Sequence, residues 1–143
     1  MSESTKKHKA EAPKMLRFGI FICSTSRYQQ LKKGELVEDV SGDLIETFLK
    51  NAGHTVTFKK LIPDAKTSIE EGMQHALASP DLDTVVFCGG TGIATSDITI
   101  ETVSPFLEKI LPGFGEIFRL LSFDKLGSAA VLSRAIAGVA RGK

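Results

Sequence analysis

Thr84-Val85-Val86-Phe87-Cys88-Gly89-Gly90-Thr91-Gly92-Ile93-Ala94-Thr95-Ser96-Asp97 is the stretch of sequence that decides the fold. Its first five residues are apolar or β-branched, which predicts a buried strand. Three glycines follow within four residues, and glycine lets bare backbone approach a phosphate group at such a turn. Asp97 lies where a helix is predicted to begin, and a carboxylate beside a phosphate loop indicates a metal ion.

The glycine loop, residues 89–92, leaves two interpretations open. It lacks the Gly-Lys-Ser/Thr of a Walker A loop, and Gly89-x-x-Gly92 is not the full dinucleotide fingerprint. Its spacing favours phosphate or nucleotide binding by Gly89, Gly90, Thr91 and Gly92. The alternative is a tight strand-to-helix turn in which the glycines serve packing alone.

Two further strands are predicted upstream, over residues 16–23 and 55–61, from an apolar run and from alternating β-branched residues. Apolar residues at helical spacing predict helices over 37–49 and 69–77. Strand and helix therefore alternate, which predicts an α/β fold of three layers: a mostly parallel sheet with helices on both faces, in a Rossmann-like topology. Beyond the loop we expect helices, including one over 129–137, and a turn at 112–115.

Three candidate loops follow the predicted strands: residues 24–27, Pro63-Asp64 and the glycine loop. Ligands of parallel sheets bind at the carboxyl ends of the strands, so Asp64 and Asp97 are predicted at one edge as a pair of Mg²⁺ ligands. Each also has a simpler interpretation, Asp64 as a turn residue and Asp97 as a helix cap. Likewise, Asp39 or Ser41 could cap the first long helix.

Composition limits the other function classes. A chain of 143 residues fits one domain, which we expect over residues 15–143 after a disordered polar tail at 1–14. The net charge of +1 disfavours nucleic acid as a partner, and the apolar runs are too short to cross a membrane. The two cysteines show no metal-ligand spacing, which predicts free thiols and a cytoplasmic protein.

Several short motifs occur in register along the chain. They are Asp39-x-Ser41-Gly42, Leu61-Ile62-Pro63-Asp64, Gly89-Gly90-Thr91-Gly92, Asp97-Ile98-Thr99 with Glu101, Pro112-Gly113-Phe114-Gly115-Glu116 and Leu132-Ser133-Arg134-Ala135. In this order they resemble the molybdopterin adenylyltransferase family of molybdenum-cofactor biosynthesis, the MoaB/Mog-type domain. The resemblance covers nearly everything from Leu16 to the end of the chain.

The resemblance implies an enzyme that transfers the adenylyl group of ATP to molybdopterin in the presence of Mg²⁺. The products are adenylyl-molybdopterin and pyrophosphate. Members of the family assemble as homotrimers, or as homohexamers built from trimers. The implied substrates are therefore ATP and molybdopterin, and the implied partner is a second copy of the same chain.

The resemblance also assigns roles by position. Asp64 and Asp97 match the two catalytic aspartates, which would hold Mg²⁺ against the triphosphate. The remaining matched positions are expected to bind substrate or phosphate, and they are Ser24, Asp39, Ser41, Gly42, Gly89, Gly90, Thr91, Gly92, Ser133 and Arg134.

The sequence departs from the family pattern at three places. Ser26 precedes Arg27 in the first-strand loop, where the family commonly has an aspartate. Thr95-Ser96 stands where the family often has a basic residue before the second aspartate. The chain also ends at Lys143, before the further strand, the Leu-Pro-Gly-x-Pro loop and the closing helix that members of the family have, which predicts a truncated domain and an unpaired sheet edge. Two alternatives stay open: a non-catalytic molybdopterin-binding or scaffold module, and a generic nucleotide-binding domain.

Overall fold

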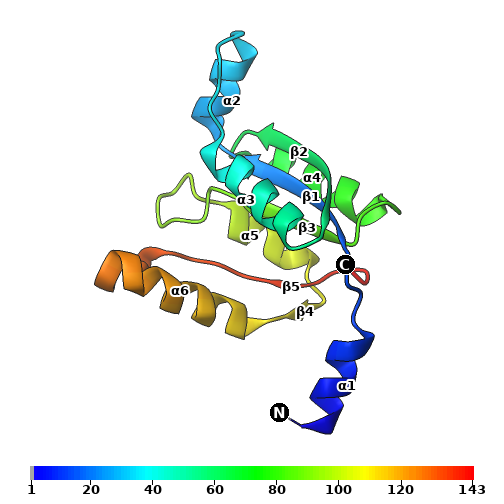
Figure 1. Cartoon of the computed structure of the whole chain (residues 1–143). Helices are drawn as coiled ribbons and strands as arrows, with labels where there is room; N and C mark the ends of the chain where they lie inside the picture. Colours follow the sequence, from blue (N-terminus) through cyan, green and yellow to red (C-terminus); the bar gives the residue numbers. More distant parts are fainter. Residues whose placement is uncertain (1) are drawn as a thin grey trace.

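A three-stranded parallel sheet lies at the centre of the computed structural model, which describes residues 2–143 apart from the side chain of Thr5 (Figure 1). In chain order the elements are α1 (Glu3–Glu11), β1 (Arg17–Cys23), α2 (Thr25–Lys32), α3 (Val40–Asn51), β2 (Thr55–Ile62), α4 (Lys66–Ala78), β3 (Thr84–Cys88), α5 (Thr99–Val103), the 3₁₀ turn η1 (Ser104–Phe106), β4 (Lys109–Ile110), α6 (Pro112–Leu126), the 3₁₀ segment η2 (Gly127–Leu132) and β5 (Gly138–Val139).

Strand β1 is the middle strand of the order β2-β1-β3, and all three strands run parallel. Its residues from Phe18 onward are buried, as expected for a strand covered on both faces. The strands predicted over 16–23, 55–61 and 84–88 are therefore confirmed, each to within one residue at either end. Strand β3 lies at the edge of this sheet.

Helices cover both faces of the sheet, with α3 on one side and α4 on the other (Figure 1). On the α4 side, Phe21 of β1 packs in a cluster with Ala76 and Leu82 and stacks on Phe87 at 4.9 Å between ring centroids. The residues on either side of Phe21 in β1, Ile20 and Ile22, face the opposite side of the sheet and are fully buried. This arrangement confirms the predicted three-layer α/β fold.

The C-terminal part differs from the prediction in two ways. Residues 112–115, expected as a turn, form the first turn of α6, because Pro112 at the first helical position suits a helix start. The helix expected over 129–137 is absent: η2 ends at Leu132, and Ser133 has extended backbone angles. Residues 133–137 form no regular element, and the two-residue strand β5 (Gly138–Val139) then pairs antiparallel with β4, a long-range contact that local sequence does not encode.

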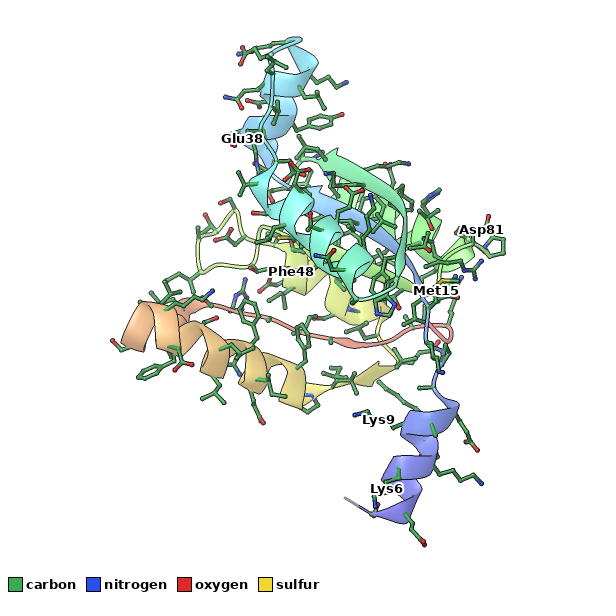
Figure 2. All side chains as sticks on the ribbon, viewed as in Figure 1. Lys6, Lys9, Met15, Glu38, Phe48 and Asp81 are labelled. Atoms are coloured by element: carbon green, nitrogen blue, oxygen red, sulfur yellow. The ribbon has the colours of Figure 1, made fainter. Side chains whose placement is uncertain are left out.

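A polar helix precedes the sheet at the N-terminus of the chain. Residues Glu3–Glu11 form helix α1, in which Lys7 and Glu11 make an exposed ion pair at 3.9 Å. The side chains of α1 other than that of Thr5 are exposed, and Lys6 and Lys9 project from α1 where the helix extends beyond the sheet (Figure 2). The disordered tail over residues 1–14 and the domain boundary at residue 15 stay predictions.

One surface carries an unusual number of exposed apolar side chains, here called the α6 face. Its members lie on α6 and η2, are between 42% and 75% exposed, and are Phe114, Ile117, Phe118, Leu120, Leu121, Phe123, Leu126, Val131 and Leu132. A helix that is apolar on most of its sides is normally a buried helix. Separately, over residues 2–143 no helix combines the length and apolar character needed to cross a membrane.

Candidate active site

The glycine loop requires glycine at its first two positions. Gly89 and Gly90 have φ angles of +106° and +61°, which side-chain-bearing residues rarely adopt. A Cβ on Gly89 would collide with the carbonyl oxygen of Cys23. A Cβ on Gly90 would lie 2.5 Å from Oγ1 of Thr99 and 2.8 Å from Oδ1 of Asp64. The missing side chains therefore let two other residues approach the loop backbone.

Thr99 fastens the loop to the start of α5. Its buried Oγ1 donates to the carbonyl of Gly89 at 2.8 Å, and its backbone N–H donates to the carbonyl of Gly90 at 3.0 Å. Thr99 is not among the predicted site residues, because a threonine at the start of a helix is commonly only a helix cap. The N-cap position of α5 is Ile98, without a side-chain bond, so Thr99 serves the loop instead.

Asp64 follows β2 and reaches the loop from the neighbouring strand end. Its Oδ2 accepts from the backbone N–H of Thr25 at 3.0 Å, and its own N–H donates to Oγ1 of Thr25 at 2.9 Å. This reciprocal pair holds the carboxylate at the start of α2. The other oxygen, Oδ1, is buried and has no hydrogen-bond partner in the part of the chain that the structure describes.

Asp97 lies on the far side of the same loop. Its Oδ2 accepts from the N–H of Ala94 at 2.9 Å, which closes the turn over residues 94–97. The same oxygen would be 2.6 Å from a Cβ on Gly92. Asp97 therefore makes a local turn contact rather than a helix cap, and its second oxygen also faces Gly92, at 3.9 Å from such a Cβ.

The two carboxylates thus flank one short loop, Asp64 beside Gly90 and Asp97 beside Gly92. Both carboxylates therefore lie against the backbone of the glycine loop, at positions two residues apart. A buried, unpartnered carboxylate oxygen is costly unless a cation or a donor satisfies it. Oxygen donors of this kind suit Mg²⁺, which keeps several water or phosphate ligands of its own.

No cluster of three or more acidic, histidine or cysteine side chains forms a metal site within residues 2–143. A cation held by Asp64 and Asp97 would therefore need its remaining ligands from water and from a phosphate-bearing substrate. Mg²⁺ is commonly bound in this way, through one or two carboxylates together with substrate phosphates. The residues present fit such an ion.

Arg134 reaches the loop from the extended segment after η2. Its Nε donates to the carbonyl of Gly92 at 2.8 Å and to that of Thr91 at 3.2 Å. One terminal nitrogen donates to the carbonyl of Asp97 at 3.2 Å, and both terminal nitrogens bond the carboxylate of Glu101. Its neighbour Ser133 ends η2, with its N–H donating to Ala130 at 3.0 Å.

The other predicted residues lie at the starts of α2 and α3. Ser24 follows β1, is the N-cap of α2 and donates its N–H to Ile62 at the end of β2 at 2.9 Å. Asp39 is the N-cap of α3, accepts from Gly42 N–H at 3.0 Å and pairs with Arg27 at 3.1 Å. A Cβ on Gly42 would collide with Asp39, and Ser41 is exposed beside it. Asp39 is therefore shown as a cap, one of the interpretations left open above.

Both cysteines are free thiols at the strand ends, as predicted. Burial raises the pKa of the Cys23 thiol to about 11, opposed by a hydrogen bond with Thr99 and supported by the nearby charge of Asp64. Burial also raises the pKa of Cys88, with the charge of Asp39 adding to the effect. The hydrogen bonds of Asp64 with Thr25 place its carboxylate directly after the end of β1.

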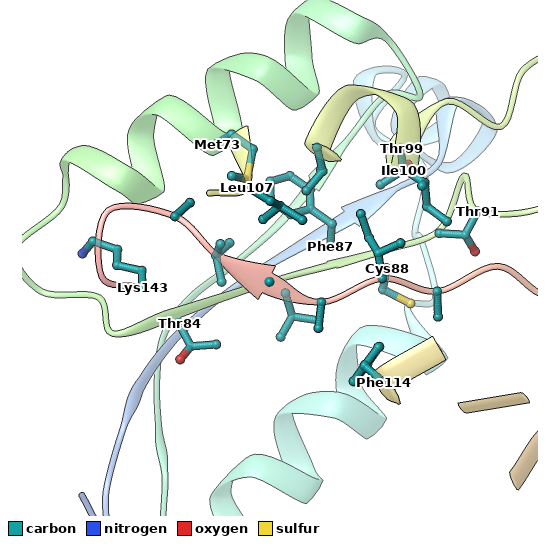
Figure 3. A pocket seen from close by; sticks show the side chains of 18 of the residues that line it. Met73, Thr84, Phe87, Cys88, Thr91, Thr99, Ile100, Leu107, Phe114 and Lys143 are labelled. Atoms are coloured by element: carbon teal, nitrogen blue, oxygen red, sulfur yellow. The ribbon is translucent and has the colours of Figure 1, made fainter. Parts of the chain in front are cut away.

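A separate cavity of about 540 Å³ runs along β3 (Figure 3). Its walls include every residue from Thr84 to Gly89 together with apolar side chains such as Leu107 and Phe114. Thr91 and Arg134 border it, whereas Asp64 and Asp97 are not among its lining residues. The unpaired edge of β3 therefore opens into an apolar slot, and the carboxylate pair lies outside it.

Comparisons with known proteins identify the family of this chain. The family model described as a probable molybdopterin binding domain matches residues 19–142. The chain is 44% identical over 141 residues to molybdenum cofactor biosynthesis protein B of Halalkalibacterium halodurans, covering 98% of this chain and 79% of the relative. It is 43% identical over 138 residues to molybdopterin adenylyltransferase of Pyrococcus furiosus, covering 96% and 77%.

Solved structures give the same result. The crystal structure of the tungsten cofactor synthesizing protein MoaB from Pyrococcus furiosus matches with a TM-score of 0.78 at 41% identity, covering 92% of this chain and 78% of that one. The likeness confirms the α/β fold and the family resemblance found in the sequence motifs.

Proposed function

This chain belongs to the family of probable molybdopterin binding domains, and from that premise we propose that it is a molybdopterin adenylyltransferase of molybdenum cofactor biosynthesis. Relatives of high identity carry the names molybdopterin adenylyltransferase and molybdenum cofactor biosynthesis protein B. The observation that carries the proposal is the position of two carboxylates, Asp64 and Asp97, on either side of the glycine loop.

In the proposed reaction a terminal phosphate oxygen of molybdopterin attacks the α-phosphorus of ATP. A new oxygen–phosphorus bond forms, the bond from the α-phosphorus to the bridging oxygen breaks, and pyrophosphate leaves with that oxygen. Negative charge accumulates on the transferred group and on the leaving group. Catalysis of such a step consists mainly of positioning and charge stabilisation.

Asp64 and Asp97 are the residues that would hold Mg²⁺. The unpartnered Oδ1 of Asp64 and the free lone pairs of Asp97 support this assignment. When bound, the ion supplies positive charge against the phosphate oxygens. The protein's own contribution is to hold the two carboxylates in place, Asp64 through Thr25 and Asp97 through Ala94.

Backbone N–H groups of Gly90, Thr91 and Gly92 are proposed to bind phosphate oxygens, as consecutive amides of a glycine loop do. The positive φ angles of Gly89 and Gly90 support this role, because they bring bare backbone to the surface of the turn. Ser24, Asp39, Ser41, Gly42 and Ser133 stay predictions as substrate-binding residues.

A non-catalytic module that binds molybdopterin is the second candidate. Exposed Thr95 and Ser96 precede Asp97 in place of a basic residue, which removes one cationic contact to phosphate. Strand β3 also lies at a sheet edge that borders an open apolar cavity, whereas sheet edges are normally covered or paired. Molybdopterin binding that is indifferent to ATP and to both aspartates is the behaviour expected of such a module.

Assembly into homotrimers or homohexamers is proposed as well, and the exposed α6 face supports it. The cellular location proposed is the cytoplasm, since both cysteines are free thiols, a state typical of reducing compartments. Neither proposal bears on the chemistry at Asp64 and Asp97.

The decisive experiment measures pyrophosphate release from ATP, Mg²⁺ and molybdopterin by the whole chain. Release is expected from the native protein and is expected to vanish in Asp64→Asn and Asp97→Asn, which keep the size of the side chain but remove its charge. Asp124→Asn, on exposed α6 surface, is the matched control and should be active. Folded native protein that binds molybdopterin without releasing pyrophosphate would favour the binding module instead.

A further inference from the structure

The protein itself engages four of the five N–H groups of the Arg134 guanidinium. An arginine has five N–H donors in a planar fork. Here Nε is shared between the carbonyls of Thr91 and Gly92, and the terminal nitrogens serve the carbonyl of Asp97 and both oxygens of Glu101. One side chain therefore joins three carbonyls of the segment 91–97 to a carboxylate of α5.

The ion pair between Arg134 and Glu101 stabilises the charged form of both side chains. Hydrogen bonding to Arg134 lowers the pKa of Glu101, and hydrogen bonding to Glu101 raises the pKa of Arg134. Bidentate pairs of this kind fix orientation as well as charge. A phosphate group could bind the guanidinium in two-pronged fashion only by displacing Glu101 or the loop carbonyls.

The carbonyl bonds also determine where the loop amides face. In a trans peptide the C=O of one residue and the N–H of the next point in opposite directions. Because the carbonyls of Thr91 and Gly92 face Arg134, the N–H groups of Gly92 and Ile93 face away from it. Two successive amides presented on one side form the kind of concavity that binds an anion.

We propose that Arg134 is a positioning residue, oriented by Glu101, that holds the glycine loop with its amides presented to the phosphate groups. This inference rests on the proposed adenylyl transfer and deepens it. It gives Arg134 a different role from the direct phosphate contact that the family resemblance implies. Glu101, absent from that set of binding residues, becomes part of the same device.

The two roles predict opposite effects of removing Glu101. If Arg134 positions the loop, Glu101→Ala loosens the loop and harms the protein in the same way as Arg134→Ala. If Arg134 binds phosphate directly, Glu101→Ala releases the guanidinium and tightens the binding of anions. Glu11→Ala removes an exposed ion pair on α1 and is the matched control.

The first readout is hydrogen exchange at the amides of residues 91–98, which needs no enzymatic activity. We expect Arg134→Ala, Arg134→Lys and Glu101→Ala each to raise exchange there about tenfold or more, since each breaks hydrogen bonds to a charged group. The double variant should resemble the single ones, because both residues act as one unit. Lysine keeps the charge but lacks the fork, so Arg134→Lys separates geometry from charge.

The second readout is the kinetics of pyrophosphate release. A fall in kcat of about tenfold with nearly unchanged KM for ATP, shared by Glu101→Ala and Arg134→Lys, supports positioning. Native exchange at residues 91–98 in folded Glu101→Ala, together with tighter binding of inorganic pyrophosphate, overturns it. If the native protein releases no pyrophosphate, the proposed reaction fails, yet hydrogen exchange and pyrophosphate binding still decide the role of Arg134.

Discussion

A buried carboxylate oxygen of Asp64 lies so close to Gly90 that a Cβ on this glycine would be 2.8 Å away. The two residues come from different strand ends, one after β2 and one after β3, with β1 between the two strands. Their contact brings the candidate metal ligand Asp64 against the glycine loop. The backbone of Gly90 and the carboxylate of Asp64 therefore tolerate no side chain between them.

Gly90→Ala is expected to destabilise the fold and to abolish pyrophosphate release. Alanine at a φ of +61° costs about 1–3 kcal/mol of stability, and its methyl group would displace Thr99 or Asp64. Gly113→Ala is the control, because nothing lies within 4 Å of a Cβ there. Thermal unfolding and product formation measure the two effects. A Gly90→Ala protein with native stability and activity contradicts the contact.

Thr25→Val is expected to weaken the response to Mg²⁺ while leaving the fold intact. Valine has the same shape but loses the hydroxyl that accepts from Asp64 N–H at 2.9 Å, which typically costs about 1 kcal/mol. The Asp64 carboxylate then loses part of its support, so a higher Mg²⁺ concentration should be needed for half-maximal pyrophosphate release. Thr67→Val, exposed on α4, serves as the control. An unchanged Mg²⁺ dependence in Thr25→Val would show that Thr25 does not support the Asp64 carboxylate in binding Mg²⁺.

The positions of these residues could be predicted from sequence to different degrees. Apolar runs and alternation were sufficient for β1, β2 and β3, because burial of a parallel sheet dictates residue type directly. Topology alone predicts that Asp64 and Asp97 follow strand ends at one edge of the sheet, and each lies beside a glycine of the loop. The partners of Arg134 could not be predicted, since they lie 33 to 43 positions away and depend on side-chain direction.

The missed helix over 129–137 has a similar cause. Ala129, Ala130 and their neighbours favour helix locally, and the sequence offers no breaker there. In the structure the segment after Leu132 is extended, because Gly138 pairs with Ile110 and Arg134 spans to the glycine loop. Long-range contacts outweigh the local helix propensity of this segment, which lies beside the candidate site.

Acid stability should depend on Asp83. Its bonds with Arg17 lower the pKa of the carboxyl from 3.8 to about 2. A carboxylate with a lowered folded-state pKa stabilises the fold above its unfolded pKa, and this contribution is lost as the pH falls from about 4 to about 2. Asp83→Asn should therefore be less stable than the native protein at pH 7 and equal to it near pH 2.

Asp81→Asn is the matched control for this titration. Asp81 also pairs with Arg17, at 3.6 Å, but its side chain is 78% exposed, so solvent screens the pair. Urea unfolding at a series of pH values should show a clear loss for Asp83→Asn and a small one for Asp81→Asn. Identical pH profiles for Asp83→Asn and native protein would contradict the shifted titration.

The α6 face should mediate contact between copies of this chain. Phe114 and Phe118 line the cavity along β3, and the other seven side chains expose on the order of 100 Å² each, or roughly 700 Å² together, close to the ~800 Å² that each partner buries in a standard interface. With a net charge of only +1, repulsion between copies is weak. We expect the 15.4 kDa chain to sediment as a trimer or hexamer, and Leu120→Glu with Leu121→Glu to sediment as a monomer.

Leu36→Glu tests whether the loss of assembly is specific to substitutions on the α6 face. Leu36 is fully exposed between α2 and α3, outside the α6 face, and its substitution adds the same kind of charge. This variant should keep the native sedimentation coefficient, whereas the α6 variant should lose it and remain folded by circular dichroism. A monomeric native protein rules out the α6 face as an interface. An α6 variant that still assembles does so too, because an apolar interface cannot stay buried around two unpaired charges.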